Sequence, residues 1–382
     1  MMDLPLQGLV VLEFSQYLSG PSAGLRLADL GARVIKIERP KGGDAGRKLA
    51  IKDLWVDDNS LLFHTINRNK ESFTADFKNA NDLEVIKKLI AKADVLIHNF
   101  RPEVMGKNGL DYKTVQQINP KMIYAEISGY GKTGPWKNKP GQDLLLQSMA
   151  GLAYTTGNGS NGPVPFGIAV TDILCGAQLV QGILAALIRR QKTGTGALIE
   201  VSLMESLLDF QFELLTTYFT NNEQPQRSYV ANGQPLLSAP YGIYATANGY
   251  IALAMMDIHL LANAIGCIAL NQFLKDQVFT ERDAIKTILA DHLVNEKTTV
   301  WLERLQEEGL WAMEVLDWEQ MTNSEAYKCL QMEQSVKAGK GDIITTRCPI
   351  RINGKKIISN KPAPQLGEHN EKLQLDFINQ QI

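Results

Sequence analysis

Residues 162–196 read GPVPFGIAVTDILCGAQLVQGILAALIRRQKTGTG, an apolar and small-residue run that a single carboxylate, that of Asp172, interrupts. After Asp172 the apolar residues recur at helical spacing, with glycine and alanine between them, which predicts a buried helix. Arginine and lysine gather toward its end, where cations suit a helix C-terminus, and Gly194 is a typical stop. The predicted helix therefore begins at Thr171 or Asp172 and ends before Gly194.

Asp172 at the start of this helix has two interpretations. Helix chemistry alone favours an ordinary N-cap, a side chain that accepts hydrogen bonds from backbone N–H groups of the first turn. The functional interpretation is a carboxylate held at the edge of an apolar pocket, as a nucleophile needs to be.

The composition is that of a soluble globular protein with a small-molecule partner. A chain of 382 residues is long enough for two domains, and 45% hydrophobic and 21% charged residues are ordinary values. The 39 Lys and Arg residues nearly balance the 41 Asp and Glu residues. No overall basic field favours nucleic acid.

The cysteines and the N-terminus indicate the compartment. Four cysteines, at positions 175, 267, 329 and 348, lie far apart without a CxxC pair, which argues against a disulfide framework and a zinc site. The first residues lack the features of a signal peptide, and no stretch approaches transmembrane length without polar interruption. We expect a cytoplasmic protein that binds no metal and no membrane.

The N-terminal segment has the pattern of a strand, a helix and a strand of a parallel sheet. Residues 9–14 and 33–38 are apolar strand-like runs, and residues 23–30 are helical in pattern after a break at Gly20-Pro21. Glu38 at the end of the second strand suggests a dinucleotide site. The first turn, residues 15–24, lacks GxGxxG, so we provisionally reject that interpretation.

Further strands and helices extend the sheet. A helix is predicted over 79–93, and strands over 94–97 and 122–127. Residues 99–102 form the turn beyond the first of these strands, where ligands of open α/β sheets collect. The glycine-rich loop 128–135 suits either a mobile turn or a backbone that lies against a ligand.

The predicted fold class is α/β, with a large Rossmann-like domain and a smaller α+β domain. Residues 1–224 form the large domain, and the C-terminal segment 331–382 returns to complete it. Residues 225–330 form the small domain, with a hairpin turn at Asn248-Gly249.

Several motifs in one order resemble the class III CoA-transferases. This family contains formyl-CoA:oxalate and crotonobetainyl-CoA:carnitine CoA-transferases and the α-methylacyl-CoA racemases. The resemblance covers nearly the whole chain and rests on VLEFSQYLSGP, LGARVIKIERP, NRNKESFTADF, ADVLIHNFRPEVM, ISGYGKTGPW, PGQDLLLQSMAGL, TDILCGAQLVQGILAAL with RRQKTGTG, and PAPQLGEH.

The resemblance implies a catalytic aspartate at Asp172, which reverses the preference for a helix cap. In the family this carboxylate attacks the donor acyl-CoA to give a mixed anhydride. CoA thiolate then attacks the enzyme acyl group, which gives an aspartyl-CoA thioester and the free donor acid. The acceptor carboxylate repeats these steps backwards. The carboxylate must be desolvated, aimed and supplied with oxyanion donors.

The resemblance also implies positions that bind CoA, which is a substrate here; no permanently bound cofactor is expected. Arg39 and Lys107 would face phosphates, while Asn99 and Phe100 would hold the adenosine or pantetheine. Lys107 replaces an arginine of other members, and Gln16 a histidine of some. The complete set is Gln16, Ser19, Arg39, Ala75, Asn99, Phe100 and Lys107.

Gln142 separates transferase from racemase. The racemases use a histidine in a GHD motif together with the catalytic aspartate as an acid/base pair. Here the motif reads Gly141-Gln142-Asp143, and Gln142 cannot titrate. We therefore prefer CoA transfer, with Asp143 either as a supporting carboxylate or as a structural cap on a helix over 144–150.

The remaining alternatives are a racemase-type epimerase and a non-catalytic CoA-binding protein; a dehydrogenase ranks last. The resemblance further implies an interlocked homodimer. No run of glycines occurs between Gln224 and Gly249, in contrast to the formyl-CoA:oxalate type. The expected acceptor is a small or medium carboxylic acid, dicarboxylic or carnitine-like, rather than oxalate.

Overall fold

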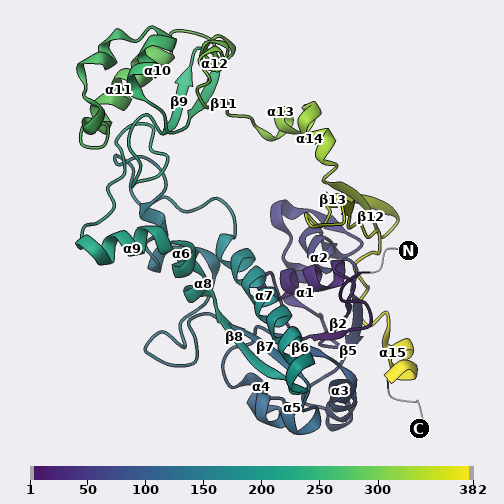
Figure 1. The fold of residues 1–382 in the computed structure, drawn as a ribbon. Coiled ribbons are helices and arrows are strands. Elements are labelled where there is room, and N and C mark those ends of the chain that lie inside the picture. Colours follow the sequence, from purple (N-terminus) through teal and green to yellow (C-terminus); the bar gives the residue numbers. More distant parts are fainter. Residues whose placement is uncertain (1–3, 378–382) are drawn as a thin grey trace. The chain divides into compact units, whose positions relative to one another are not determined.

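The computed structural model describes residues 4–377 of the chain. A sheet of six parallel strands lies in the order β5-β2-β1-β6-β7-β8 (Figure 1). Its strands are β1 (Val10–Glu13), β2 (Arg33–Glu38), β5 (Glu71–Thr74), β6 (Val95–His98), β7 (Ile123–Ser128) and β8 (Ala197–Ser202). Counted within this sheet the order is 3-2-1-4-5-6, a doubly wound arrangement whose ligands bind where the strand order reverses. The predicted parallel α/β sheet is confirmed.

Helices bury the sheet on both faces. α3 (Ala80–Lys92) and α5 (Tyr112–Ile118) share a hydrophobic core with one face of the strands. α1 (Ser19–Asp29) packs against α7 (Val170–Thr193), which also lies along β7 and β8 (Figure 1). Burial from both sides explains why the inner strands are apolar without alternation.

The predicted break at Gly20-Pro21 is wrong, because α1 already begins at Ser19. Pro21 is the third residue of the helix, in the first turn, where backbone N–H groups have no intrahelical partner. A proline there removes no helical hydrogen bond. The helix consequently starts directly at the C-terminal edge of the sheet.

α7 is the one helix in the described part of the chain that is long and apolar enough to cross a membrane. The sequence predicts no uninterrupted stretch of transmembrane length, so the length and composition of α7 depart from that prediction. The helix packs against α1, β7 and β8, so its apolar character belongs to a core helix. It ends before Gly194, which has a φ of +73°, as the sequence predicts.

The chain forms two compact units. The first contains the described parts of Met1–Leu146, Ala169–Leu207 and Leu330–Ile382, and the second contains Gln147–Ile168 and Leu208–Cys329. Segments 147–168 and 208–224, which the sequence assigns to the large domain, thus lie in the second unit.

Hydrogen bonds within the second unit explain this difference. The guanidinium of Arg227 donates to the carbonyls of Thr156, Asn161 and Gly162. The side-chain amide of Gln211 donates to the carbonyl of Ala150. Such contacts between distant segments have no signature in local sequence patterns.

The second unit has its own sheet and core. β9 (Gly242–Thr246) and β10 (Gly249–Leu253) pair as an antiparallel hairpin, which confirms the predicted hairpin, and β11 (Ala312–Glu314) pairs with β10. The helices α10, α11 and α12 pack on this sheet. They span Ile258–Ile265, Arg282–Leu293 and Thr298–Glu307.

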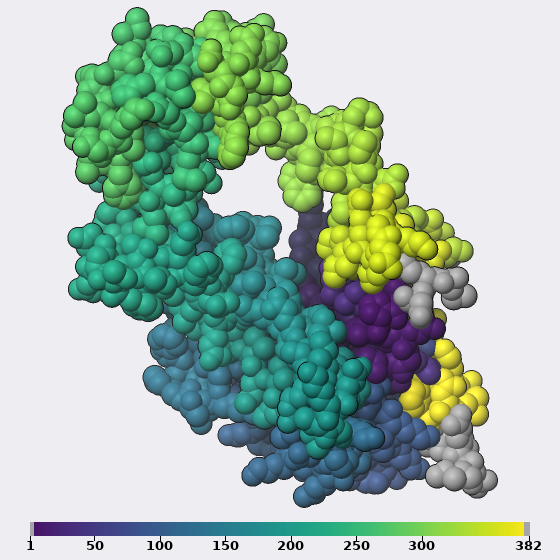
Figure 2. All heavy atoms as spheres, in the orientation of Figure 1, coloured from purple at the N-terminus to yellow at the C-terminus, as the bar shows by residue number. Residues whose placement is uncertain are grey.

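The C-terminal segment lies against the N-terminal part of the first unit. α15 (Asn370–Phe377) packs on β5, and the Asn370 side chain hydrogen-bonds Thr74. Figure 2 shows the yellow C-terminal atoms beside purple N-terminal ones. The remaining elements are β3 (Trp55–Val56), β4 (Asn59–Ser60), α2 (Leu61–Asn67), α4 (Val104–Lys107), α6 (Asp143–Met149), α8 (Leu203–Phe210), α9 (Phe212–Asn221), α13 (Trp318–Asn323), α14 (Glu325–Leu330), β12 (Glu333–Ala338), β13 (Gly341–Thr346), β14 (Arg351–Ile352) and β15 (Lys355–Lys356), with short 3-10 turns between some of them.

Candidate active site

The loops that follow β1 and β6 meet at the point where the strand order reverses. The backbone N–H of Gln16 donates to Asn99 Oδ1 at 2.9 Å, and Asn99 Nδ2 donates to the Gln16 carbonyl at 2.7 Å. The same amide nitrogen lies 3.4 Å from Ser19 Oγ. Asn99, which the resemblance assigns to CoA binding, therefore holds the loop that contains Gln16 and Ser19.

Asp172 is partly buried in the first turn of α7, where α1 and α7 approach closely. The Ser19 side chain lies near enough to this carboxylate to lower its pKa. Gly176, one turn further along α7, permits this approach: a Cβ there would lie only 2.7 Å from the Ser19 carbonyl oxygen. Two sequence-predicted residues, Ser19 and Asp172, are thus neighbours where α1 meets α7.

The N-cap interpretation of Asp172 is wrong. α7 begins at Val170 with Ala169 as its N-cap, so Asp172 is the third helical residue. Asp143, at the start of α6, supports the first turn instead, because its Oδ1 accepts the Thr171 N–H at 2.8 Å. Asp143 therefore joins α6 to α7 beside Asp172.

The environment of Asp172 disfavours its anion. Burial and the negative charge of Asp143 raise the pKa of Asp172 to about 6, although the hydrogen bond from Ser19 acts in the opposite direction. A carboxylate with a raised pKa is less solvated and more nucleophilic than one in water. At neutral pH most of it is still ionised.

A pocket of about 280 Å³ lies on the first unit at the C-terminal edge of the sheet. It is lined by residues of the loops after β1, β2, β5 and β6. Four sequence-predicted CoA positions, Gln16, Arg39, Ala75 and Phe100, are among its walls. Gln16 connects this pocket to the catalytic candidate, since Ser19 follows three residues later and contacts Asp172.

The pocket combines an aromatic wall with cations. Phe77 and Phe100 pack edge to face with ring centroids 6.1 Å apart. Arg39, whose guanidinium donates to the Gly43 carbonyl, and Lys78 line the same pocket. Such walls suit a ligand with a flat or apolar part and a negatively charged part.

Two further sequence-predicted residues are exposed in the described chain. Lys107 lies on α4 and pairs with Glu103 at 3.7 Å, outside the pocket walls. Gln142 is exposed beside the start of α6, and its carbonyl accepts the N–H groups of Leu145 and Leu146.

Sequence reasoning missed Phe77 and Lys78 as pocket residues. Phe77 ends the motif NRNKESFTADF, in which the resemblance assigns a CoA contact only to Ala75. The available signal was its place after β5, at the edge where the loops of a parallel sheet gather. Among residues 4–377 no group of three His, Cys, Asp or Glu side chains is arranged to hold a metal ion.

A family model described as CoA-transferase family III matches residues 6–370. A succinate–glutarate CoA-transferase of Agrobacterium fabrum is 31% identical over 385 residues, covering 97% of this chain and 94% of that protein. An acetyl-CoA:oxalate CoA-transferase of Acetobacter aceti is 31% identical over 382 residues, covering 98% and 96%. A crystal structure described as a CAIB/BAIF family protein from Brucella suis has a TM-score of 0.84 and 29% identity, covering 98% of this chain and 100% of that one.

Proposed function

The chain belongs to CoA-transferase family III and is an enzyme that acts on acyl-CoA with carboxylate acceptors; from this premise we propose that Asp172 transfers CoA through covalent intermediates. The observation that carries the proposal is the partly buried Asp172 carboxylate, with its pKa raised to about 6 and in contact with Ser19. Membership confirms the resemblance inferred from the motifs.

The proposed reaction begins when an Asp172 oxygen attacks the thioester carbonyl of the donor. The C–S bond breaks, CoA leaves as the thiolate, and a mixed anhydride of Asp172 and the donor acid forms. The thiolate then attacks the aspartyl carbonyl, which releases the donor acid and leaves an aspartyl-CoA thioester. The nucleophiles in these two steps are the Asp172 carboxylate and the CoA thiolate, so no water is consumed.

The second half repeats these steps in reverse with the acceptor. The acceptor carboxylate attacks the aspartyl thioester, which gives a new anhydride and free thiolate. The thiolate attacks the acceptor acyl carbonyl, which forms the product acyl-CoA and regenerates the Asp172 carboxylate. The reaction exchanges one thioester for another and needs no redox step.

We assign supporting roles to the surrounding groups. The Ser19 hydroxyl orients the Asp172 carboxylate. The negative charge of Asp143 raises the pKa of Asp172, and Asp143 also holds the start of α7 through the Thr171 N–H. The pocket of Arg39 and Phe100 would take part of the CoA molecule. Lys107 would reach a phosphate as a point charge.

The acceptor we propose is a small dicarboxylic acid. The similar proteins of A. fabrum and A. aceti are named for succinate, glutarate and oxalate. The missing glycine run argues against oxalate, so four- and five-carbon diacids are the first to test. Carnitine-like acids are the second group.

The test is intact-protein mass spectrometry after incubation with acyl-CoA donors and hydroxylamine. Hydroxylamine converts an activated aspartyl group into a hydroxamate, so the wild-type mass should shift at Asp172. Asp172→Asn is the matched control and should show no shift while it still binds CoA. A wild type that binds CoA but shifts with no donor would contradict the covalent route.

A racemase-type epimerase is the second candidate, because Asp172 and Asp143 place two carboxylates near one another. Gln142 stands against it, since it cannot remove or return a proton. Exchange of the α-proton of a 2-methylacyl-CoA into deuterated water, without CoA transfer to any acid, would favour the epimerase.

A further inference from the structure

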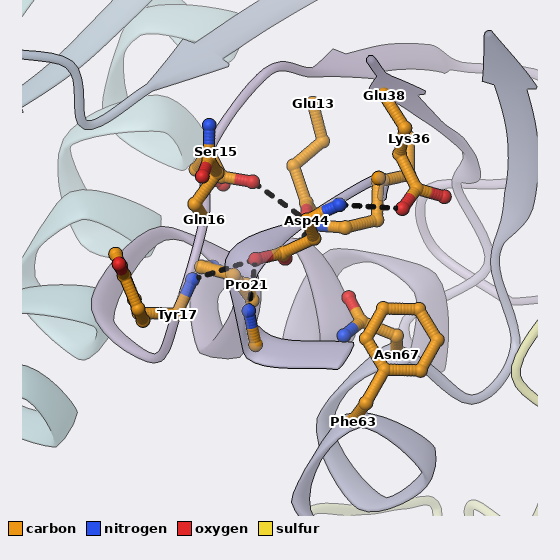
Figure 3. Close-up of polar contacts among 12 residues, drawn as sticks. Glu13, Ser15, Gln16, Tyr17, Pro21, Lys36, Glu38, Asp44, Phe63 and Asn67 are labelled. Carbon is orange, nitrogen blue, oxygen red and sulfur yellow. Dashed lines mark hydrogen bonds and ion pairs between the residues drawn. The ribbon is translucent and has the colours of Figure 1, made fainter. Parts of the chain in front are cut away.

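A buried ionic cluster lies beneath the loop that contains Gln16 (Figure 3). At its centre Lys36 Nζ lies 2.8 Å from Glu13 Oε1 and 2.7 Å from Asp44 Oδ2, and it donates to the Ser15 carbonyl at 2.9 Å. Lys70 Nζ completes the cluster, 2.8 Å from Glu13 Oε2. All four charged side chains are buried.

Such a cluster needs a reason other than stability. Desolvation of buried charges consumes most of their mutual attraction, and apolar residues of similar volume often stabilise a fold equally well. What buried ions do supply is fixed geometry, because each group must face its partners. The contribution of this cluster therefore lies in the backbone segments that it holds in place.

Asp44 joins two loops of the pocket. Its Oδ2 faces Lys36, whereas its Oδ1 accepts the N–H groups of Tyr17 at 3.1 Å and Gly46 at 2.8 Å. The Asp44 N–H donates to the Glu38 carboxylate, which also accepts two hydrogen bonds from the Arg47 guanidinium. The loops after β1 and β2, which both line the pocket, are thereby tied to one carboxylate.

Tyr17 has a conformation that needs such support. Its φ is +64°, a left-handed conformation that is unfavourable for a residue with a side chain, and the residue is 52% exposed. The ring therefore has little packing with which to fix the backbone. The hydrogen bond to Asp44 does so, between Gln16 in the pocket wall and Ser19 on Asp172.

We propose that Asp44, oriented by Lys36, is a positioning residue that holds Tyr17 in its left-handed conformation and so shapes the CoA pocket at Gln16. The inference rests on the proposed function, because it takes the pocket to be a CoA site. Burial raises the pKa of Asp44, but the attraction of Lys36 and three hydrogen bonds outweigh it and keep the pKa below its usual value. Asp44 is therefore the anion that both sides require.

Asp44→Asn tests the proposal, because an amide cannot accept hydrogen bonds on both sides. If its oxygen faces Tyr17, its NH₂ meets the Lys36 ammonium; if it turns, its NH₂ meets the backbone N–H groups. We expect the dissociation constant of CoA, measured by isothermal titration calorimetry well below the unfolding temperature, to rise about tenfold. Deuterium exchange at the Tyr17 amide should become faster.

Asp29→Asn is the matched control. Asp29 and Asp44 are each only 2% exposed, and Asp29 pairs with Arg68 through bonds of 2.6 and 2.9 Å, but it does not line the pocket. The Asp29→Asn variant should have a lower unfolding temperature, and its CoA affinity should stay within about twofold of the wild type. Equal losses of CoA affinity in the two variants would overturn the proposal.

A second pair of variants leaves the buried charges intact. Tyr17→Val puts a β-branched residue at the left-handed position and should weaken CoA binding about as much as Asp44→Asn. Tyr17→Asn also removes the exposed ring but tolerates that conformation, and it should bind CoA more tightly than Tyr17→Val. Equal affinities in these two variants would contradict the role of the backbone conformation.

The outcomes separate this inference from the proposed function. A wild type that binds CoA but forms no aspartyl intermediate contradicts the covalent mechanism and leaves the positioning role of Asp44 standing. A wild type that transfers CoA, together with an Asp44→Asn variant of unchanged CoA affinity, contradicts the positioning role alone.

Discussion

At Asp172, burial, a second carboxylate and a serine hydroxyl act on the same group. Burial and Asp143 raise its pKa, and the hydrogen bond from Ser19 lowers it. The balance keeps the carboxylate ionised at neutral pH but poorly solvated. This is the state that favours attack on a thioester, because an oxygen that has lost water has less solvent to displace.

The first prediction is a loss of activity in acid. Because only the ionised Asp172 attacks, kcat/KM should fall tenfold per pH unit below about pH 6, the pKa of this group. The measurement is transfer between stable donors and acceptors from about pH 4.5 to 8. A profile that stays flat down to about pH 4.5 would mean a carboxylate with an ordinary pKa.

The second prediction concerns stability. The pKa rises from 3.8 to about 6 on folding, so the anion destabilises the fold above pH 6 and not below the ordinary pKa. Asp172→Asn should therefore raise the free energy of unfolding at pH 7 by about 1–2 kcal/mol, less than the full shift because the group is partly exposed.

Urea denaturation of both proteins at pH 7 and about pH 4 would measure this effect. The gain of the asparagine variant should be full at pH 7 and much smaller at about pH 4, where the carboxyl is protonated in the folded state and about half protonated in the unfolded state. A variant that is less stable than the wild type at pH 7 would contradict an anion disfavoured by its surroundings.

At the scale of elements, the contact of α1 with α7 brings Ser19 to Asp172. Gly176 makes this contact possible, since an added Cβ would meet Ser22 Oγ at 2.3 Å and the Ser19 carbonyl oxygen at 2.7 Å. The carbonyl belongs to the backbone and cannot turn away as a flexible side chain does. The helices themselves must therefore separate to accept a larger residue.

The third prediction is that Gly176→Ala lowers kcat at least tenfold and destabilises the protein by about 1–3 kcal/mol, as overpacking does. Gly341→Ala is the control, because nothing lies within 4 Å of a Cβ there and its φ is not positive. Steady-state kinetics and thermal unfolding measure the two effects. A Gly176→Ala variant with normal kcat would show that the Ser19 contact is dispensable.

At the scale of the whole molecule, the first unit exposes apolar side chains on α6 and along α7. Leu144 on α6 and Ile173 and Ile188 on α7 are 59%, 49% and 59% exposed. Large apolar side chains left exposed in this way favour association with another protein surface. From these residues we propose a homodimer, interlocked as the resemblance implies.

The fourth prediction follows from that proposal. Multi-angle light scattering at low micromolar concentration should give twice the mass of one chain, because interlocked chains cannot separate on dilution. Ile188→Glu should slow assembly on refolding and leave Asp172 untouched. A stable wild-type monomer with full transfer activity would contradict the dimer.

The sequence by itself determined the main strands, α7 with its stop at Gly194, the hairpin of the second unit and the family. Each depends on local periodicity, on turn residues or on motifs, all of which can be read without a partner segment. Asp172, Ser19, Gln16 and Arg39 came from these motifs, and the structure brings Ser19 against Asp172 and puts Gln16 and Arg39 in one pocket.

Only the tertiary structure decided the start of α1, the inclusion of 147–168 in the second unit, and the work of the buried ions. Lys36 and Asp44 read as ordinary charged residues, and only the fold shows that Asp44 pairs with Lys36 and also accepts the N–H of Tyr17, 27 residues earlier in the chain. The physical reason is that the role of a buried charge depends on the polar partners that replace its hydration water. Those partners come from loops that the sheet, and not the local sequence, brings together.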